Sequence, residues 1–178
     1  NGKITNLKNF LNDKNLIVYK ADILDKKKLE TIFKNCKYVF HLAALADIVP
    51  SIENPQKYFE TNVIGTFNVL EASKKNKVEK IIYAASSSCY GISNKPPFNE
   101  KTSISTEYPY ALTKHLGEQL ISHWGKIYNI NYASLRLFNV YGPRSRTSGA
   151  YGAVFGVFLA QKIASKPFTV VGNGRQKR

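Results

Sequence analysis

Short apolar runs alternate with longer amphipathic stretches along this chain. The runs are rich in β-branched and aromatic residues, which favour strands, and they span residues 16–19, 38–40, 81–84, 132–137 and 168–171. Apolar positions recur at helical spacing in longer stretches, at residues 25–33, 55–75, 109–128 and 153–165. This alternation predicts an α/β fold in which a parallel sheet is covered by helices.

The residues that follow the predicted strands carry the most distinctive chemistry. Ligands of open parallel sheets bind outside the carboxyl ends of the strands. Those positions hold Asp22 and Ile23, HLAA at 41–44, SSSCYG at 86–91 and FNVYGPR at 138–144. We therefore expect four loops to form one rim that binds a ligand.

The chain is strongly basic, with 26 Lys and Arg against 12 Asp and Glu and a formal net charge of +14. A nucleic-acid surface is one interpretation of such a charge. Apart from Lys26 to Lys28 and the closing Arg175, Lys177 and Arg178, however, the basic residues are scattered and form no stripe with aromatic residues. This distribution favours a solvated lysine-rich surface, and we expect no nucleic-acid partner.

Length and composition indicate a soluble globular protein. The 178 residues, 43% of them hydrophobic, suit one folded domain, and a chain without Met that opens on Asn1 is expected to be part of a longer one. Cys36 and Cys89 form no C-x-x-C motif, which fits a reducing cytoplasm. The apolar run at 153–160 is shorter than the roughly 20 residues of a membrane helix, and no signal peptide opens the chain, so no membrane partner is expected.

Tyr110 and Lys114 form the strongest local signal for catalysis. They lie four residues apart in a predicted helix and therefore share a face. A phenol is a poor base at its ordinary pKa near 10, but a neighbouring ammonium lowers that pKa by favouring the phenolate. Ser86, at the end of the third predicted strand, is placed to share the same substrate hydroxyl. A surface-exposed Tyr and a solvated Lys are the alternative interpretation.

The histidines do not follow a metal-binding pattern. His41 ends a predicted strand and is expected to pack in the core. His115 and Glu118 share a helix but lack the second pair of ligands that a metal site needs. We predict no metal.

Seven ordered motifs resemble one family. They are Asp22-Ile23, HLAA at 41–44, TNVIGT at 61–66, SSSCYG at 86–91, YPYALTK at 108–114, FNVYGPR at 138–144 and VVGNGRQKR at 170–178. In this order and spacing the chain is similar to the extended short-chain dehydrogenases/reductases of the NAD-dependent epimerase/dehydratase branch, most of all to UDP-N-acetylglucosamine and UDP-glucose 4-epimerases. The resemblance implies a Rossmann-type, doubly wound NAD-binding domain over residues 1–145, and the start of a nucleotide-sugar region at 146–178.

The resemblance also implies roles for individual residues. Tyr110 would be the catalytic base, Lys114 would bind the nicotinamide ribose, and Ser86 would hydrogen-bond the sugar 4-hydroxyl. Contacts with NAD would come from Asp22, Ile23, Leu42, Ala43, Ala44, Asn62, Ala84, Tyr110, Lys114 and Phe138. Contacts with the nucleotide sugar would come from Ser86, Ser87, Ser88, Asn139, Ala153, Val154, Phe158, Thr169 and Arg178, the last through a guanidinium fork on the diphosphate.

The chain departs from the family pattern in two places. The glycine-rich turn that cradles the cofactor phosphates is absent together with its strand and helix, and the chain stops at Arg178, before most of the small substrate domain. The 178 residues alone are therefore expected to bind NAD poorly and to be inactive. Val49 stands where many relatives place an Arg that reaches the substrate, which leaves the sugar's substituents open.

Ser87 and Ser88 favour one reaction within the branch. The 4,6-dehydratases carry an Asp and a Glu at these positions. Because this chain has serines there instead, a 4-epimerase that works through a transient 4-keto sugar is favoured. SGAYGAV at 148–154 resembles UDP-N-acetylglucosamine 4-epimerases most and UDP-glucose 4-epimerases next. The alternatives are a UDP-glucuronate decarboxylase or epimerase, a 4,6-dehydratase, and a catalytically silent NAD- or nucleic-acid-binding scaffold. The resemblance also implies a homodimer formed through helices at about 57–75 and 109–128.

Overall fold

The computed structural model describes residues 4–92, 97–144, 154–170 and 172–174. The chain forms two compact units. One comprises residues 1–21 and 139–169, and the other comprises residues 22–138 and 170–178.

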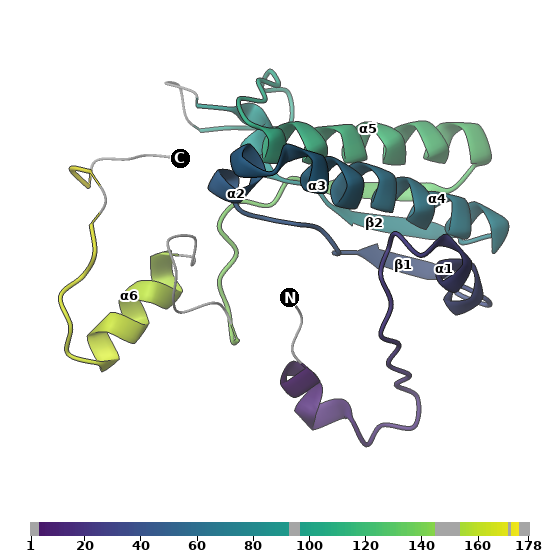
Figure 1. Cartoon of the computed structure of the whole chain (residues 1–178), viewed down its shortest axis with the longest axis horizontal. Helices are drawn as coiled ribbons and strands as arrows, with labels where there is room; N and C mark the ends of the chain where they lie inside the picture. The colour runs from purple at the N-terminus through teal and green to yellow at the C-terminus, as the bar shows by residue number, and fades with distance from the viewer. Residues whose placement is uncertain (1–3, 93–96, 145–153, 171, 175–178) are drawn as a thin grey trace. The chain divides into compact units, whose positions relative to one another are not determined.

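A three-stranded parallel sheet forms the centre of the larger unit. Its strands are β1 (Tyr38–His41), β2 (Lys80–Ala84) and β3 (Asn131–Leu135), and they lie side by side in that order (Figure 1). Lys80 is in register with Tyr38 on one side and with Asn131 on the other. Because both strand pairs are parallel, all three carboxyl ends lie at one edge of the sheet. The predicted α/β fold with a parallel sheet is confirmed.

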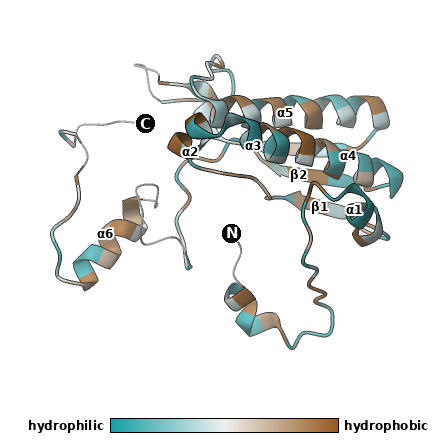
Figure 2. Ribbon diagram, in the orientation of Figure 1, coloured by the Kyte–Doolittle hydropathy of each residue, from teal (hydrophilic) through white to brown (hydrophobic). Residues whose placement is uncertain are grey.

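Two long helices cover one face of this sheet. α4 (Gly65–Lys75) packs against β1, and α5 (Pro109–Tyr128) packs against β2 and β3. The core between these layers is built on apolar side chains with no more than 1% exposure, namely Leu70, Ile81, Tyr83 and Ile121. Figure 2 shows hydrophobic and hydrophilic residues alternating along α4 and α5, as amphipathic helices require.

The helix predicted over 55–75 contains an unexpected π-helical turn. α3 (Pro55–Phe59) leads into the π-helix η2 (Glu60–Ile64), which leads directly into α4. Asn54 caps the start of α3, because its side chain accepts a hydrogen bond from the backbone N–H of Lys57 at 3.3 Å. π-Helical turns insert one extra residue and recur at functional sites.

Three shorter helices complete the larger unit. α1 (Lys26–Ile32) begins where predicted, because the Asp25 side chain accepts from the N–H of Lys28 at 3.0 Å. α2 (Ile48–Glu53) was not predicted. The 3-10 helix η3 (Ser87–Tyr90) follows β2.

The smaller unit contains the 3-10 helix η1 (Ile4–Phe10) and α6 (Val154–Ile163). The strand predicted at 16–19 is wrong, and residues 168–170 of the strand predicted at 168–171 are also not in a strand. A strand needs a neighbour to satisfy its backbone groups, and within the described ranges neither segment has one. None of the described helices is both long enough and apolar enough to cross a bilayer.

Candidate active site

The first turn of α5 is held by a serine from a distant helix. Pro109 occupies the first helical position, but the N-cap residue Tyr108 makes no side-chain cap. Instead, the backbone N–H of Tyr110 donates to the hydroxyl of Ser51 at 3.1 Å, and Ser51 in α2 is fully buried. Helix α2 therefore fixes the turn of α5 that carries Tyr110.

Tyr110 and Ser86 meet at the carboxyl end of β2. The Tyr110 hydroxyl donates a hydrogen bond to Ser86 Oγ at 3.4 Å. Ser86 caps η3, since its Oγ accepts from the N–H of Ser88 at 3.2 Å and lies 2.7 Å from Ser88 Oγ. The structure thus brings together the two hydroxyl-bearing residues that the sequence placed in separate elements, and one substrate oxygen can bridge them.

The pKa of the Tyr110 phenol is raised, not lowered. Burial raises it most, the hydrogen bond with Ser86 lowers it in part, and the charge of Asp47 raises it further. The expected lowering by Lys114 is not seen, because the ammonium is directed elsewhere. Lys114 Nζ lies over the ring of Tyr83, 4.3 Å from its centroid.

Lys114 is a buried ammonium beside an aromatic face. Lys114 is only 4% exposed, and this burial lowers the pKa of its ammonium to about 8. None of the ion pairs within the described part of the chain includes it. The amine therefore keeps hydrogen-bond donors available for a ligand hydroxyl.

His41 lies next to Lys114 and stays neutral. Burial, and then the charge of Lys114, lower its pKa to about 3. Its Nε2 is 2.8 Å from Thr66 Oγ1, which itself donates to the backbone carbonyl of Asn62. Nε2 therefore carries the ring proton. The expectation that His41 is a packed core residue is confirmed.

Asn62 connects the loop after β1 to α5. It lies in the π-helix η2 and is 1% exposed. Its amide accepts from the N–H of Leu45 at 2.8 Å, and it donates to the carbonyl of Leu45 at 3.0 Å and to Thr113 Oγ1 at 3.1 Å. The side chain thereby holds the backbone next to Leu42, Ala43 and Ala44, of which the first two are exposed.

The other predicted cofactor positions of the larger unit lie before α1, at the end of β2 and after β3. Asp22 Oδ1 accepts from the N–H of Leu24 at 2.9 Å, and Ile23 packs against the backbone of Gly65. Ala84 ends β2. Phe138 stacks on Tyr90, with ring centroids 6.4 Å apart.

The predicted substrate positions are divided between the two units. Ser86, Ser87 and Ser88 belong to the larger unit, whereas Asn139, Val154, Phe158 and Thr169 belong to the smaller one. Phe158 stacks on Phe168 at 4.9 Å, and the N–H of Thr169 donates to the Gln161 side chain at 3.2 Å. Ala153 and Arg178 lie outside the described residues, and the substrate role of all these positions stays a prediction.

Sequence reasoning missed the ion pair between Glu118 and Arg136. Arg136 donates to Glu118 through Nε at 3.1 and 3.0 Å and through Nη2 at 2.8 Å. Its Nη1 donates to the hydroxyl of Tyr90 at 3.1 Å. The available signal was the spacing of Tyr110, Lys114 and Glu118, which are successively four residues apart on α5.

Curated proteins similar to this chain are named as UDP-sugar epimerases. A putative UDP-glucose 4-epimerase of Methanocaldococcus jannaschii is 38% identical over 176 residues, which are 98% of this chain and 57% of that protein. UDP-glucuronate 4-epimerase 1 of Arabidopsis thaliana is 36% identical over 169 residues, 92% of this chain and 38% of that protein. The chain thus spans about half or less of the length of these relatives.

The solved structures and the family pattern agree with this similarity. The UDP-N-acetylglucosamine 4-epimerase of Methanobrevibacter ruminantium M1, solved in complex with UDP-N-acetylmuramic acid, matches with a TM-score of 0.88 and 33% identity, over 96% of this chain and 55% of that one. This match supports the predicted Rossmann-type architecture. The pattern of the NAD dependent epimerase/dehydratase family matches residues 3–178. The chain belongs to the NAD-dependent epimerase/dehydratase family.

Proposed function

We propose that the complete protein epimerises a UDP-sugar at C4, with NAD as cofactor, through a transient 4-keto sugar. The observation that carries this proposal is the contact of the Tyr110 hydroxyl with Ser86 Oγ, one helical turn from the buried Lys114. Relatives named as UDP-glucose and UDP-glucuronate 4-epimerases support it.

The residues around Lys114 fit the nicotinamide end of NAD. Its buried ammonium has no carboxylate partner among the described residues, so a ribose hydroxyl can accept from it. The loop at 42–44 presents Leu42 and two small residues, which leave room for a close-lying ligand. When bound there, NAD would supply a hydride acceptor for C4 of the sugar and a donor for the return of that hydride.

Tyr110 removes the proton of the sugar 4-hydroxyl and later returns it. Ser86 Oγ accepts from the 4-hydroxyl or donates to it, and so holds that oxygen within reach of the phenol. Tyr110 takes the proton while the hydride leaves C4, and returns it after the keto sugar has turned its other face. Tyr110 is partly buried, and burial is the largest cause of the raised pKa of its phenol.

An N-acetylglucosamine sugar is our first choice of substrate, with glucose second. No carboxylic acid follows Ser86, which disfavours the water elimination of a 4,6-dehydratase. The SGAYGAV stretch at 148–154 supports the acetylated sugar. UDP-glucuronate is the alternative, supported by the Arabidopsis relative.

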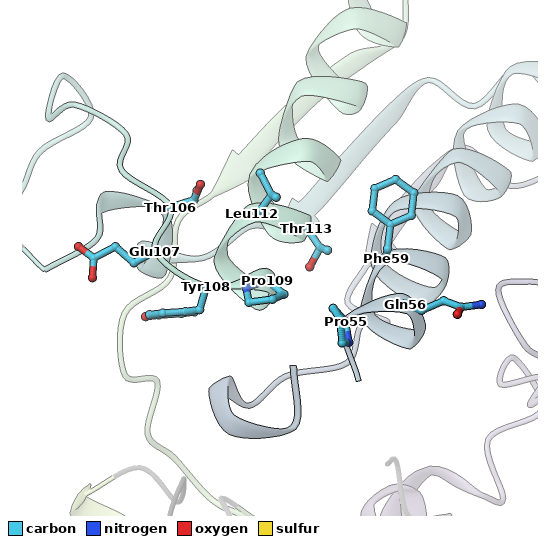
Figure 3. A pocket seen from close by; sticks show the side chains of 9 residues that line it. All are labelled: Pro55, Gln56, Phe59, Thr106, Glu107, Tyr108, Pro109, Leu112 and Thr113. Carbon is cyan, nitrogen blue, oxygen red and sulfur yellow. The ribbon is translucent and has the colours of Figure 1, made fainter. Parts of the chain in front are cut away.

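We also propose that the protein is a cytoplasmic homodimer. A largely apolar cavity of about 510 Å³ lies between α3 and α5. Figure 3 shows Phe59 and Leu112 on opposite sides of it. Both residues are 45% exposed, which is unusual for a packed helix pair and suits a second pair of helices. Cys36 and Cys89 are free thiols, which suits a reducing compartment.

Proton NMR of the complete protein tests the reaction and the sugar together. UDP-N-acetylglucosamine, UDP-glucose and UDP-glucuronate are each incubated without added NAD. The proposal predicts that the 4-epimer of one of them appears, because the cofactor is regenerated in every cycle. A 4-keto-6-deoxy product, a decarboxylated product, or no change with any sugar, with or without added NAD, would contradict it.

A further inference from the structure

We propose that Glu118 and Arg136 are positioning residues that fix the far end of the serine turn η3 through Tyr90, and so align Ser86 with Tyr110. This inference rests on the proposed function, because alignment matters only if Ser86 and Tyr110 act on the same oxygen. It gives a role to Tyr90, Glu118 and Arg136, to which the family resemblance assigned none.

One face of α5 holds both ends of the turn. Tyr110, Lys114 and Glu118 follow one another at intervals of four residues and therefore lie along a single stripe of the helix. Tyr110 contacts Ser86, which precedes η3. Glu118, two turns further along the same stripe, accepts three hydrogen bonds from Arg136.

Arg136 connects this stripe to the last residue of η3. Its Nη1 donates to the hydroxyl of Tyr90 at 3.1 Å, and its guanidinium carbon lies 5.1 Å from the centroid of the Tyr90 ring. Tyr90 is 5% exposed. A guanidinium is planar, so its fork with Glu118 also fixes the direction of the remaining donor toward Tyr90.

The aromatic neighbours of Tyr90 extend the same support. The ring stacks on Phe98 at 5.4 Å and on Phe138 at 6.4 Å between centroids. Phe138 is a predicted nicotinamide contact. Through Tyr90, the pair of Glu118 and Arg136 therefore supports both the serine turn and Phe138.

The contact between Tyr110 and Ser86 is long enough to depend on this support. At 3.4 Å it is near the limit of a hydrogen bond, so a small displacement of η3 breaks it. A turn of four residues is short, and a shift of Tyr90 is passed on to Ser86. A misplacement of about 1 Å near a reacting group can cost about 100-fold in rate.

Two variants of the complete protein test the assignment. Glu118→Gln removes the negative charge that faces Arg136. Tyr90→Phe removes only the hydroxyl that accepts from Arg136, so the packing of the ring and the fold of the protein are retained. We expect kcat to fall about 10-fold to 100-fold in both, with KM changed less than threefold. Glu30→Gln is the matched control, because it removes the ion pair of Glu30 with Lys75 between α1 and α4. It should keep kcat within twofold.

A double-mutant cycle separates positioning from simple stabilisation. If Tyr90 acts through Ser86, Tyr90→Phe has little further effect on kcat in a Ser86→Ala background. Fully additive losses, or an unchanged kcat in the single variant, would overturn the proposal. If Tyr90→Phe only destabilised the fold, thermal melting would show the loss. Its effect on kcat would then multiply with that of Ser86→Ala in the double variant.

A readout without turnover keeps this inference distinct from the proposed reaction. With tyrosine labelled by ¹³C at Cζ, the signal of Tyr110 is assigned by its loss in Tyr110→Phe. The pKa of that phenol should rise in Tyr90→Phe, because the hydrogen bond with Ser86 lowers it in the native protein. An unchanged pKa would overturn the positioning role even if no sugar proves to be a substrate.

Discussion

The Tyr110 hydroxyl reaches across from α5 to Ser86 Oγ, at 3.4 Å, and so joins the helix to the turn after β2. This contact depends on elements from four parts of the chain. Ser51 of α2 fixes the backbone of Tyr110, and Asn62 of η2 ties the loop after β1 to Thr113. The phenol is thereby held in place by contacts within the chain.

Removing the Ser86 hydroxyl should slow catalysis and shift its pH dependence. We expect Ser86→Ala to lower kcat about 10-fold to 100-fold. The hydrogen bond lowers the pKa of Tyr110, so its loss raises that pKa, and the acid limb of the profile of kcat against pH moves to higher pH. Ser103→Ala, at an exposed serine, should leave the profile unchanged. An acid limb that stays in place would argue against Tyr110 as the base held by Ser86.

The buried ammonium of Lys114 should reduce the stability of the folded protein at neutral pH. Burial lowers its pKa from 10.5 to about 8, so between these values the unfolded chain binds a proton that the folded chain does not. The free energy of unfolding from Lys114 therefore rises with pH across that window, by about 1.4 kcal/mol per pH unit at most. We expect Lys114→Met to abolish this rise, to raise the free energy of unfolding at pH 7 by about 1–3 kcal/mol, and to lose activity.

Urea unfolding at pH 7 and at pH 9 measures this effect. Lys126→Met, at an exposed position of the same helix, is the control and should leave the pH dependence as in the native protein. A loss of stability in Lys114→Met at pH 7 would show that the ammonium is better compensated than its burial indicates.

His41 should make the free energy of unfolding depend on pH in the acid range. Its pKa is lowered from 6.5 to about 3, so below pH 6.5 the unfolded chain binds a proton that the folded chain refuses. Stability from this residue is therefore present above pH 6.5 and is lost progressively as the pH falls toward 3. Between pH 6.5 and 4.5 the native protein should lose on the order of 2 kcal/mol more than His41→Asn. Equal losses in urea unfolding would contradict a buried neutral imidazole.

Gly117 marks a close approach of α5 to the sheet. A Cβ at this position would collide with the hydroxyl of Tyr83, whose ring carries the Lys114 ammonium. Gly117→Ala should destabilise the protein by about 1–3 kcal/mol, because the buried Tyr83 has no space into which it can move. Thermal melting measures this loss, and Ser122→Ala, at another position of α5, should change stability far less. A stabilised Gly117→Ala would contradict the packing described.

The helices show what a periodic pattern can predict. α5 was predicted with its observed bounds, 109–128, because its apolar period is long and Pro109 marks its start. The π-helical turn at Glu60–Ile64 was not predicted, since an inserted residue inside an amphipathic helix changes the pattern little. The strand predicted at 16–19 failed because strand propensity does not supply a partner strand.

Within the site, spacing predicted proximity but not direction. The spacing of Tyr110 and Lys114 correctly put both on one face of α5, yet the long lysine side chain turns to Tyr83 and does not lower the pKa of the phenol. The cap from Ser51 was missed because it is a contact over 59 residues that no local motif records. The link between Ser86 and Tyr110 was predicted from the place of Ser86 at the end of a strand, and the family resemblance added their roles.

The exchange of Tyr110 for Phe tests the central claim most directly. The variant removes one oxygen and retains the ring, so the fold and the edge contact with Tyr58 should persist. Proton NMR of the complete protein with its UDP-sugar measures formation of the 4-epimer. Tyr132→Phe is the control, because the hydroxyl of Tyr132 lies 3.0 Å from Ser122 Oγ, away from Ser86. We predict that Tyr110→Phe lowers epimer formation at least about 1,000-fold while Tyr132→Phe stays close to the native rate. Interconversion at the native rate in Tyr110→Phe would contradict the account.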